Sequence, residues 1–113
     1  MHPGTAIQLS QDEMLLLAEQ IPNEVCNGFR IENFEACIGC GQREFIKLAL
    51  ELRSRLQAQV YSMNVTEAQL LHNALRATLC ELGEEEFFTR TGFEFVAGTL
   101  LLKKLDDFLN QPR

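Results

Sequence analysis

Two cysteines separated by two residues form the strongest chemical motif in the chain. Cys37 and Cys40 stand in the stretch EACIGCGQREF, directly before a segment with helical periodicity. A pair with this spacing can supply half of a structural zinc site, which needs four ligands. It can also form a redox pair if the N-terminus of the following helix stabilises a thiolate.

The remaining candidate ligands complete neither kind of site. Cys26 and Cys80 are isolated beside apolar residues, where a free cysteine behaves as a small hydrophobic side chain. A thioredoxin-like site also needs a strand before the motif, and the sequence predicts a loop there. We therefore expect loop and core cysteines without a metal or other cofactor. The alternative is a metal-binding or thiol redox protein that uses Cys37 and Cys40, together with Cys26 or Cys80.

No other residue pattern predicts catalysis. His72 has no histidine or cysteine at a ligand spacing on its helix, and Ser54, Ser62 and Thr91 lack a nearby base. The acidic run at 84–86 lacks the alternating ligands and the turn glycine of a calcium loop. We therefore expect that the protein is not an enzyme.

Length and charge narrow the class of protein further. The 113 residues fit a single domain over 1–113. The net charge is −6, without a basic patch, which disfavours nucleic acid and suits a basic protein partner. The stretch MHPGTAIQLSQDE has no signal-peptide pattern, and the longest nearly uncharged run, Phe95 to Leu102, is shorter than the roughly 20 residues of a membrane span. We expect a cytoplasmic protein with reduced thiols.

Capping and periodicity predict a first helix that begins after Ser10. Ser10 and Glu13 have the spacing of a capping box, and an apolar series with helical spacing follows. Pro22 lacks an N–H and collides with the preceding turn of a helix, so we expect a kink or a break near Ile21. The Asn-Gly pair at 27–28 then predicts a left-handed C-terminal end.

Three further helices are predicted. Apolar residues at steps of three and four indicate a helix over residues 42–61. Another covers 65–82, with a capping-box spacing at Thr66 and Gln69, and ends at a glycine. After an acidic connector, the last helix covers 94–109. The segment FFTRTGFEFV also alternates as a strand does, so a small hairpin is the alternative there.

The two halves of the chain, about 9–61 and 65–110, resemble each other. Gly39 and Gly92 lie 53 positions apart (92 − 39), and several apolar residues repeat at the same offset. Two unrelated amphipathic helix pairs can also agree in part. The pattern nevertheless favours an all-α domain of four main helices, built as two duplicated helix–loop–helix units with approximate two-fold symmetry. Each unit would bury the apolar face of the other.

Both halves also resemble one known sequence pattern. NEVCNGFRIENFE in the first half, and LLHNAL, FFTRTGF and LLKKL in the second, are similar to parts of LLxNALNEVCNGI…FE…G…LLxxL. This pattern recurs in small uncharacterised bacterial helical proteins. The resemblance covers most of the chain, once per half, and its motifs are caps, turns and core positions. It implies a helical fold and a bacterial cytoplasmic protein, and it implies no activity.

The first and last helices carry more apolar surface than one packing face uses. The extra residues are Leu15, Leu16, Phe93, Phe95, Val96, Leu100 and Leu102. Such surplus indicates either a helix that is central to its own domain or a second buried surface. We therefore predict a protein–protein interaction or regulatory module, either a homodimer or the partner of a protein with a basic surface, that binds through these residues.

Overall fold

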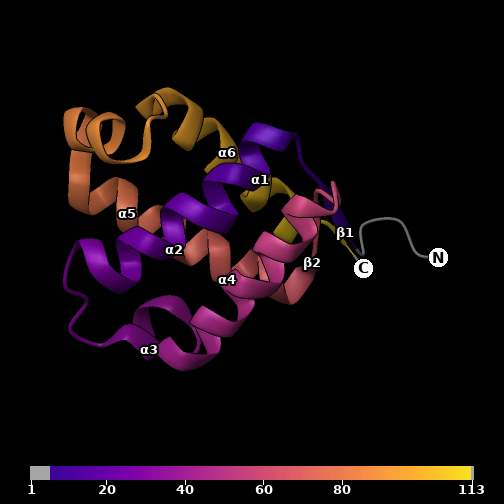
Figure 1. The fold of residues 1–113 in the computed structure, drawn as a ribbon, viewed down its shortest axis with the longest axis horizontal. Coiled ribbons are helices and arrows are strands. Elements are labelled where there is room, and N and C mark those ends of the chain that lie inside the picture. Colours follow the sequence, from indigo (N-terminus) through magenta and orange to yellow (C-terminus); the bar gives the residue numbers. More distant parts are fainter. Residues whose placement is uncertain (1–5, 113) are drawn as a thin grey trace.

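The computed structural model describes residues 6–112, and this part of the chain is mostly α-helical (Figure 1). The prediction of a predominantly helical fold is therefore confirmed. The first five residues, on which the expected absence of a signal peptide partly rests, lie outside the described residues. The elements in chain order are β1 (Ala6–Gln8), α1 (Gln11–Leu15), the π-helical η1 (Leu16–Gln20), α2 (Ile21–Asn23), the π-helical η2 (Glu24–Gly28), α3 (Phe34–Ile38), α4 (Gln42–Gln57), β2 (Ser62–Asn64), α5 (Val65–Thr91) and α6 (Phe95–Leu109).

The first helix begins as predicted but does not break at its proline. The Glu13 N–H donates to Ser10 Oγ at 3.1 Å and the Ser10 N–H donates to Glu13 Oε1 at 2.8 Å, which completes the capping box. The chain then stays helical to Gly28, passing through Pro22 with a π turn on each side. A π turn removes the close i→i−4 approach with which a proline ring collides. The helix therefore widens around the proline and continues.

Gly28 ends this helix for a reason other than the predicted left-handed cap. The positive-φ glycines are Gly39, Gly83 and Gly92, and Phe29 leaves the helix in an extended conformation. A Cβ atom on Gly28 would lie 2.2 Å from Oε1 of the buried Glu24. Glycine at this position thus makes room for a buried carboxylate.

The buried Glu24 joins the first helix to the far end of α5. Arg90 Nη1 lies 3.2 Å from Glu24 Oε1 and donates to the Gly28 carbonyl at 2.8 Å. Arg90 Nε also donates to Glu86 Oε2 at 2.9 Å, one turn back along α5. One guanidinium therefore links two helical segments that are far apart in sequence.

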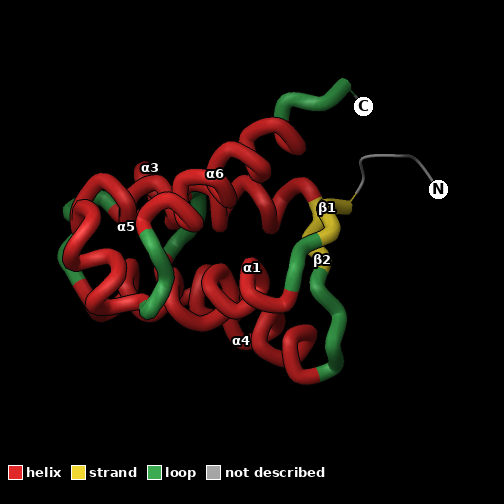
Figure 2. Tube along the Cα trace, turned by 90° about the horizontal axis from the view of Figure 1, so that it is seen from above, coloured by secondary structure: helices red, strands yellow, loops and turns green. Residues whose placement is uncertain are grey.

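The helix predicted over 42–61 is shorter than expected. α4 ends at Gln57, after which Gln59 adopts a positive φ of 62°. The turn redirects the chain into β2, which pairs antiparallel with β1 through Ile7 and Met63. Figure 2 shows these two strands side by side at one end of the helices. Strands of three residues are too short to give a period-two signal in the sequence.

The last helix has the predicted extent, whereas the helix predicted over 65–82 continues to Thr91 as α5. α6 begins after Glu94 and ends at Leu109, as expected. Gly83 interrupts α5 with non-helical angles, but the following residues return to helix up to Thr91. The acidic connector is therefore helical, and the hairpin alternative is wrong. α3 was not predicted; the Asn33 side chain caps its N-terminus.

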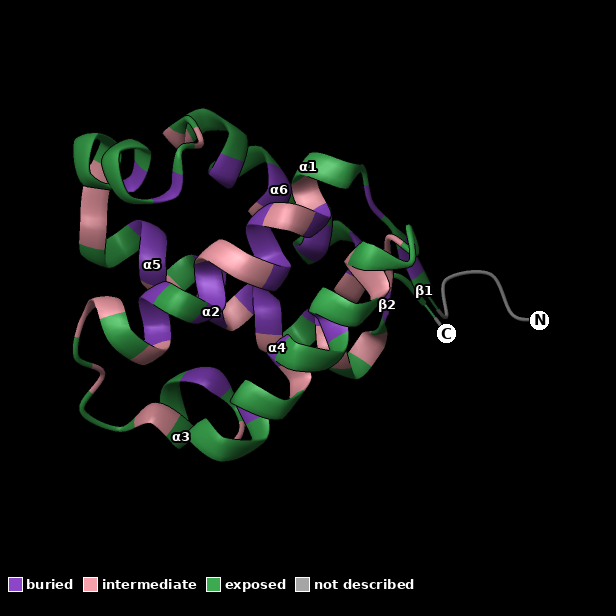
Figure 3. Ribbon diagram, viewed as in Figure 1, coloured by how far each residue is buried: buried purple, intermediate pink, exposed green. Residues whose placement is uncertain are grey.

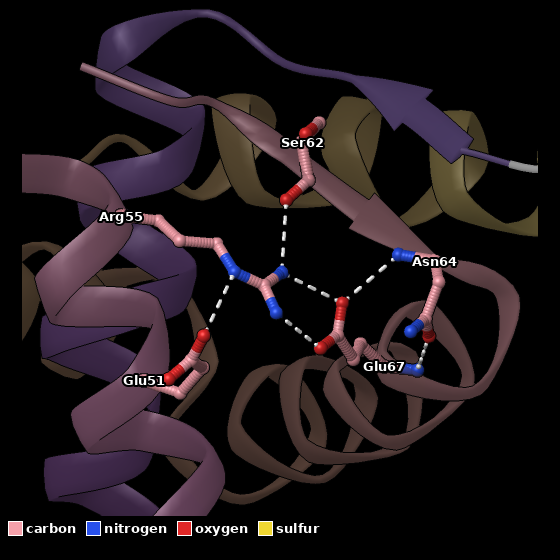
Figure 4. Close-up of polar contacts among 5 residues, drawn as sticks. All are labelled: Glu51, Arg55, Ser62, Asn64 and Glu67. Atoms are coloured by element: carbon pink, nitrogen blue, oxygen red, sulfur yellow. Dashed lines mark hydrogen bonds and ion pairs between the residues drawn. The ribbon is translucent and has the colours of Figure 1, made fainter. Parts of the chain in front are cut away.

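A polar cluster at the start of α5 holds three elements together (Figure 4). Both nitrogens of the Arg55 fork donate to Glu67, at 2.8 and 2.6 Å, and Arg55 Nη1 also reaches the Ser62 carbonyl at 3.3 Å. Glu67 forms the capping box of α5 with Asn64, at 2.9 and 2.8 Å. The predicted box at Thr66 and Gln69 is wrong by two positions. The cluster fixes α4, β2 and the start of α5 relative to one another.

α5 is the central helix of the core. It contacts α6, α3 and the first helix. The buried faces of the helices meet in one apolar cluster, and their outer faces are exposed (Figure 3). The largest fully buried side chains are those of Phe45, Phe87, Met14, Leu16, Leu17, Ile21, Ile38, Leu52, Met63, Leu71, Leu75 and Leu105.

Candidate interaction surface

The outer face of α6 carries the most exposed large apolar side chains among the described residues. Val96 and Leu100 are 61% and 63% exposed and lie one turn apart. Lys103 and Asp107 continue the same face toward the C-terminus, joined by an ion pair of 3.4 Å. We call these four residues the α6 stripe. Because the opposite side of α6 is fully used in the core, the stripe is available to another molecule.

A groove runs beside the stripe. It lies between β1 and the C-terminal half of α6 and has a volume of about 570 Å³. Leu100 and Lys103 form one wall, and the residues of β1 form the other. The combination of a projecting apolar residue with a neighbouring hollow is the shape that a protein partner can fill.

Two polar contacts fix the orientation of α6. Lys104 Nζ lies 2.9 Å from Glu13 Oε1, and Asp106 Oδ1 lies 3.3 Å from His72 Nε2. Burial raises the pKa of the Glu13 carboxyl, but the Lys104 ammonium and hydrogen bonds from Ser10 outweigh it and leave this pKa below its usual value. The stripe therefore lies between two contacts that tie α6 to α1 on one side and to α5 on the other.

Five of the predicted interface residues pack against their own chain. Phe95 stacks edge-on against Phe87 with ring centroids 6.0 Å apart, and Phe93 and Leu102 also pack on the core. Leu15 is partly buried. Leu16 is only 1% exposed and belongs to the core, so its assignment to an interface is wrong.

The first helix has its wide apolar face because it is covered on more than one side. It contacts both α4 and α5. This agrees with the first of the two explanations for surplus apolar surface, a helix that is central to its own domain. The surplus that remains for a partner lies on α6, at Val96 and Leu100.

His72 is a structural residue. It is buried, and its two ring nitrogens lie near oxygen atoms of Asp106, at 3.3 Å, and Asn73, at 3.4 Å. The Asn73 amide in turn donates to the Ile38 carbonyl at 2.7 Å. The histidine connects α5 to α6 and, through Asn73, to α3.

The cysteines do not assemble a metal site in the described residues. No three side chains of His, Cys, Asp or Glu between residues 6 and 112 come close enough to share an ion. All four cysteines are free thiols: Cys37 and Cys80 are exposed, and Cys26 and Cys40 are partly buried. Within the described residues, Cys37 and Cys40 therefore have no further ligand close enough to form a metal site with them.

The surroundings of Cys40 disfavour its thiolate form, whereas a reactive cysteine needs surroundings that stabilise it. Burial, followed by the carboxylates of Glu44 and Glu35, raises its pKa. Burial also raises the pKa of the Cys26 thiol, against a hydrogen bond from Gln42. Low-pKa thiols need cationic or dipolar stabilisation of the thiolate. The helix start after Cys40 does not offset these effects.

A thiol titration of the native protein is expected to divide the four cysteines into a fast-reacting pair and a slow-reacting pair. The exposed Cys37 and Cys80 should react first with a disulfide reagent at neutral pH, and Cys26 and Cys40 should react more slowly because their pKa values are raised and they are partly buried. Elemental analysis of freshly purified protein should give no stoichiometric zinc. Stoichiometric zinc, or protection of Cys37 together with Cys40, would contradict this interpretation.

Comparison with known proteins adds no relative: no protein-family model matches the chain, and no curated protein or solved structure is significantly similar to it. Among the described residues, every helix is either too short or too polar to cross a membrane.

Proposed function

We propose that the protein is a cytoplasmic protein–protein interaction module without catalytic activity, and that the α6 stripe pairs with the same stripe of a second copy. The observation that carries this proposal is the exposure of Val96 and Leu100 on a helix that polar contacts hold on both sides, to Glu13 through Lys104 and to His72 through Asp106. Exposed apolar side chains on a fixed helix face are the anchors that helical interfaces use.

The charges of α6 favour an antiparallel pair with two-fold symmetry. Glu94 precedes the apolar residues, and Lys103 and Lys104 follow them. In an antiparallel pair whose axis crosses the outer face of α6 at the level of Gly98, Val96 of one copy faces Leu100 of the other, and Glu94 comes near Lys103 of the other. Such an interface is self-complementary, as a two-fold dimer requires.

The net charge of −6 supports a protein with a basic surface as the alternative partner. Glu81, Glu84 and Glu85 make no ion pair with any residue from 6 to 112, and the last two precede Phe88, which is 49% exposed, by about one helical turn. Unpaired carboxylates around an aromatic side chain complement a basic partner. The same charge disfavours nucleic acid.

We also propose that the fold arose by duplication of a helix–loop–helix unit. Support comes from Gly39 and Gly92, which both end a helical segment with positive φ, at 114° and 77°. The helix that follows each of them, α4 or α6, begins three residues later. The pairing of Ile7 with Met63 at the centre of the antiparallel strands is the arrangement that a two-fold axis between the halves produces.

The interaction proposal is tested by replacing one apolar residue of the α6 stripe with a charged one. Leu100→Glu places a charge at the centre of the proposed interface, so we expect self-association to weaken by about tenfold or more. Sedimentation equilibrium over a range of concentrations measures this change. Val60→Glu is the matched control, because Val60 is also a large exposed apolar residue, 46% exposed, but belongs to the turn between α4 and β2.

Either of two outcomes contradicts the proposal. One is equal self-association of wild-type protein and Leu100→Glu, and the other is an equal loss in Val60→Glu. Far-UV circular dichroism of both variants checks that they are folded, which we expect because both side chains are largely exposed.

A further inference from the structure

A second groove lies between the first helix and α4 and does not involve α6. It has a volume of about 180 Å³ and is lined by Pro22 and Cys26 from the first helix and by Ile46, Ala49, Leu50 and Arg53 from α4, together with three amide side chains. Ile46 and Leu50, one turn apart on its rim, are 44% and 58% exposed. An apolar cavity of about 150 Å³ accommodates a benzene ring, so the groove is of the right size for one large side chain.

The charged side chains at the groove are positive, although the net charge of the protein is −6. Arg53 lines the groove, and Arg43 lies one turn before Ile46 on the same face of α4. Neither arginine makes an ion pair with any residue in the described range, whereas Arg55 and Arg90 are both paired with carboxylates. Two unpaired guanidinium groups beside an apolar groove favour a ligand that carries carboxylates.

No carboxylate of the protein lines this groove. The residues of the first helix that line it are uncharged. Glu24, on the same helix, is buried and bonded to Arg90. Glu19, one turn before Asn23, does not contribute to the lining. The local field along the groove is therefore set by the arginines of α4.

We propose that this groove binds an acidic amphipathic helix of a partner protein, with one large apolar side chain in the groove and carboxylates on Arg53 and Arg43. A groove between two helices is the kind of site into which a third helix inserts its apolar face. Ile46 and Leu50 supply apolar contacts at the rim, and the thiol of Cys26, whose pKa is raised by burial, is a neutral part of the floor. This site does not depend on the α6 stripe.

The proposal is tested with a pair of synthetic helical peptides. Both carry leucine at positions i and i+4; in one the leucines are flanked by glutamate, and in the other by lysine. Fluorescence anisotropy with the native protein is expected to show the glutamate peptide binding about tenfold or more tightly than the lysine peptide. Raised salt should weaken the glutamate peptide's binding, because the arginines are exposed.

Substitutions at the groove test whether the peptides bind there or elsewhere on the protein. Arg53→Glu should remove the preference for the glutamate peptide, and Leu50→Gln, which removes an apolar contact without adding a charge, should weaken both peptides. Arg76→Glu is the matched control, since Arg76 is also exposed and without an ion pair in the described range but lies on α5. It should leave the preference unchanged, and so should Leu100→Glu.

Three results would overturn the proposal. They are equal binding of the two peptides, an unchanged preference in Arg53→Glu, and a change in self-association of the protein alone when Arg53 is reversed, since the last would make a second copy the occupant. Because Arg53 is exposed and makes no hydrogen bond or ion pair with a described residue, its variant is expected to fold. Failure of these tests leaves the α6 proposal unaffected, as the two sites use different residues.

Discussion

Phe87→Ala is expected to lower the free energy of unfolding by about 3–5 kcal/mol. Phe87 is fully buried at the junction of α5 and α6. Its ring lies directly against the backbone of α6, because a Cβ atom on Gly98 would come within 2.9 Å of Phe87 Cζ. It also packs edge-on against Phe95. Neither backbone can move far into the space left by the ring, since α6 is held at other points. Urea unfolding followed by circular dichroism measures the loss.

The neighbouring residue provides the control for this prediction. Phe88→Ala removes the same side chain from a position that is 49% exposed, so its effect is expected to stay within about 0.5 kcal/mol. Similar losses for the two variants would mean that the second half of α5 is turned differently about its axis. Because Phe87 supports α6, its loss should also weaken any association through the α6 stripe.

Glu67→Gln is expected to lower the free energy of unfolding by about 2–3 kcal/mol at neutral pH. The change removes the charge that the Arg55 fork binds at 2.6 and 2.8 Å. It leaves a guanidinium that is only 25% exposed without its main partner. Charge-assisted, bidentate pairs of this kind are stronger than ordinary surface ion pairs. The effect should appear as a lower urea midpoint with an unchanged slope.

The same residue predicts how the wild-type protein responds to acid. Burial raises the pKa of Glu67, but hydrogen bonds from Arg55 and from the Asn64 N–H outweigh it, so the pKa lies below its usual value of 4.5. A carboxyl with a lowered pKa in the folded state stabilises the fold above its unfolded pKa. This stability is lost as the pH falls through the folded value. Below pH 4.5, wild-type protein should therefore lose part of its advantage over Glu67→Gln.

Glu51 is the matched control within the same cluster. Its carboxylate lies 3.6 Å from Arg55 Nε, but its side chain is 61% exposed. Exposed ion pairs contribute little to stability, so Glu51→Gln should change the free energy of unfolding by less than about 0.5 kcal/mol. Equal effects of the two substitutions would contradict the assignment of Glu67 as the principal partner of Arg55.

Local signals in the sequence predict a large part of this fold. The Ser10 and Glu13 box marks the first helix because capping depends only on residues within one turn. The interruption at Gly83 and the start of α6 follow from similar local rules. These features need no knowledge of the tertiary structure.

Other features depend on tertiary contacts, and the sequence alone does not reveal them. The first helix passes through Pro22 because packing on several sides stabilises two π turns, while propensity alone favours a break. The position of the α5 cap is set at Asn64 by the pairing of β2 with β1 and by Arg55 from α4. Gly28 is explained only by a carboxylate that is buried against it.

Some of the candidate interaction residues could likewise be predicted from the sequence, and others could not. Surplus apolar residues were recognised on two helices, but the sequence could not separate Leu16, which the core uses, from Leu100, which it leaves exposed. Ile46 and Leu50 were missed. They lie four residues apart on a different face of α4 from its core residues, beside Arg43 and Arg53, and this spacing is a signal that a helical projection of residues 42–57 can reveal.

Light scattering of the unmodified protein after size-exclusion chromatography tests the central proposal most directly. If the α6 stripe pairs with a second copy, the molar mass at micromolar concentration should approach twice the 12.8 kDa of the chain and fall toward 12.8 kDa on dilution. Leu100→Glu should give the lower mass at every concentration. A constant mass of 12.8 kDa for the unmodified protein, identical to that of the variant, would contradict the proposal.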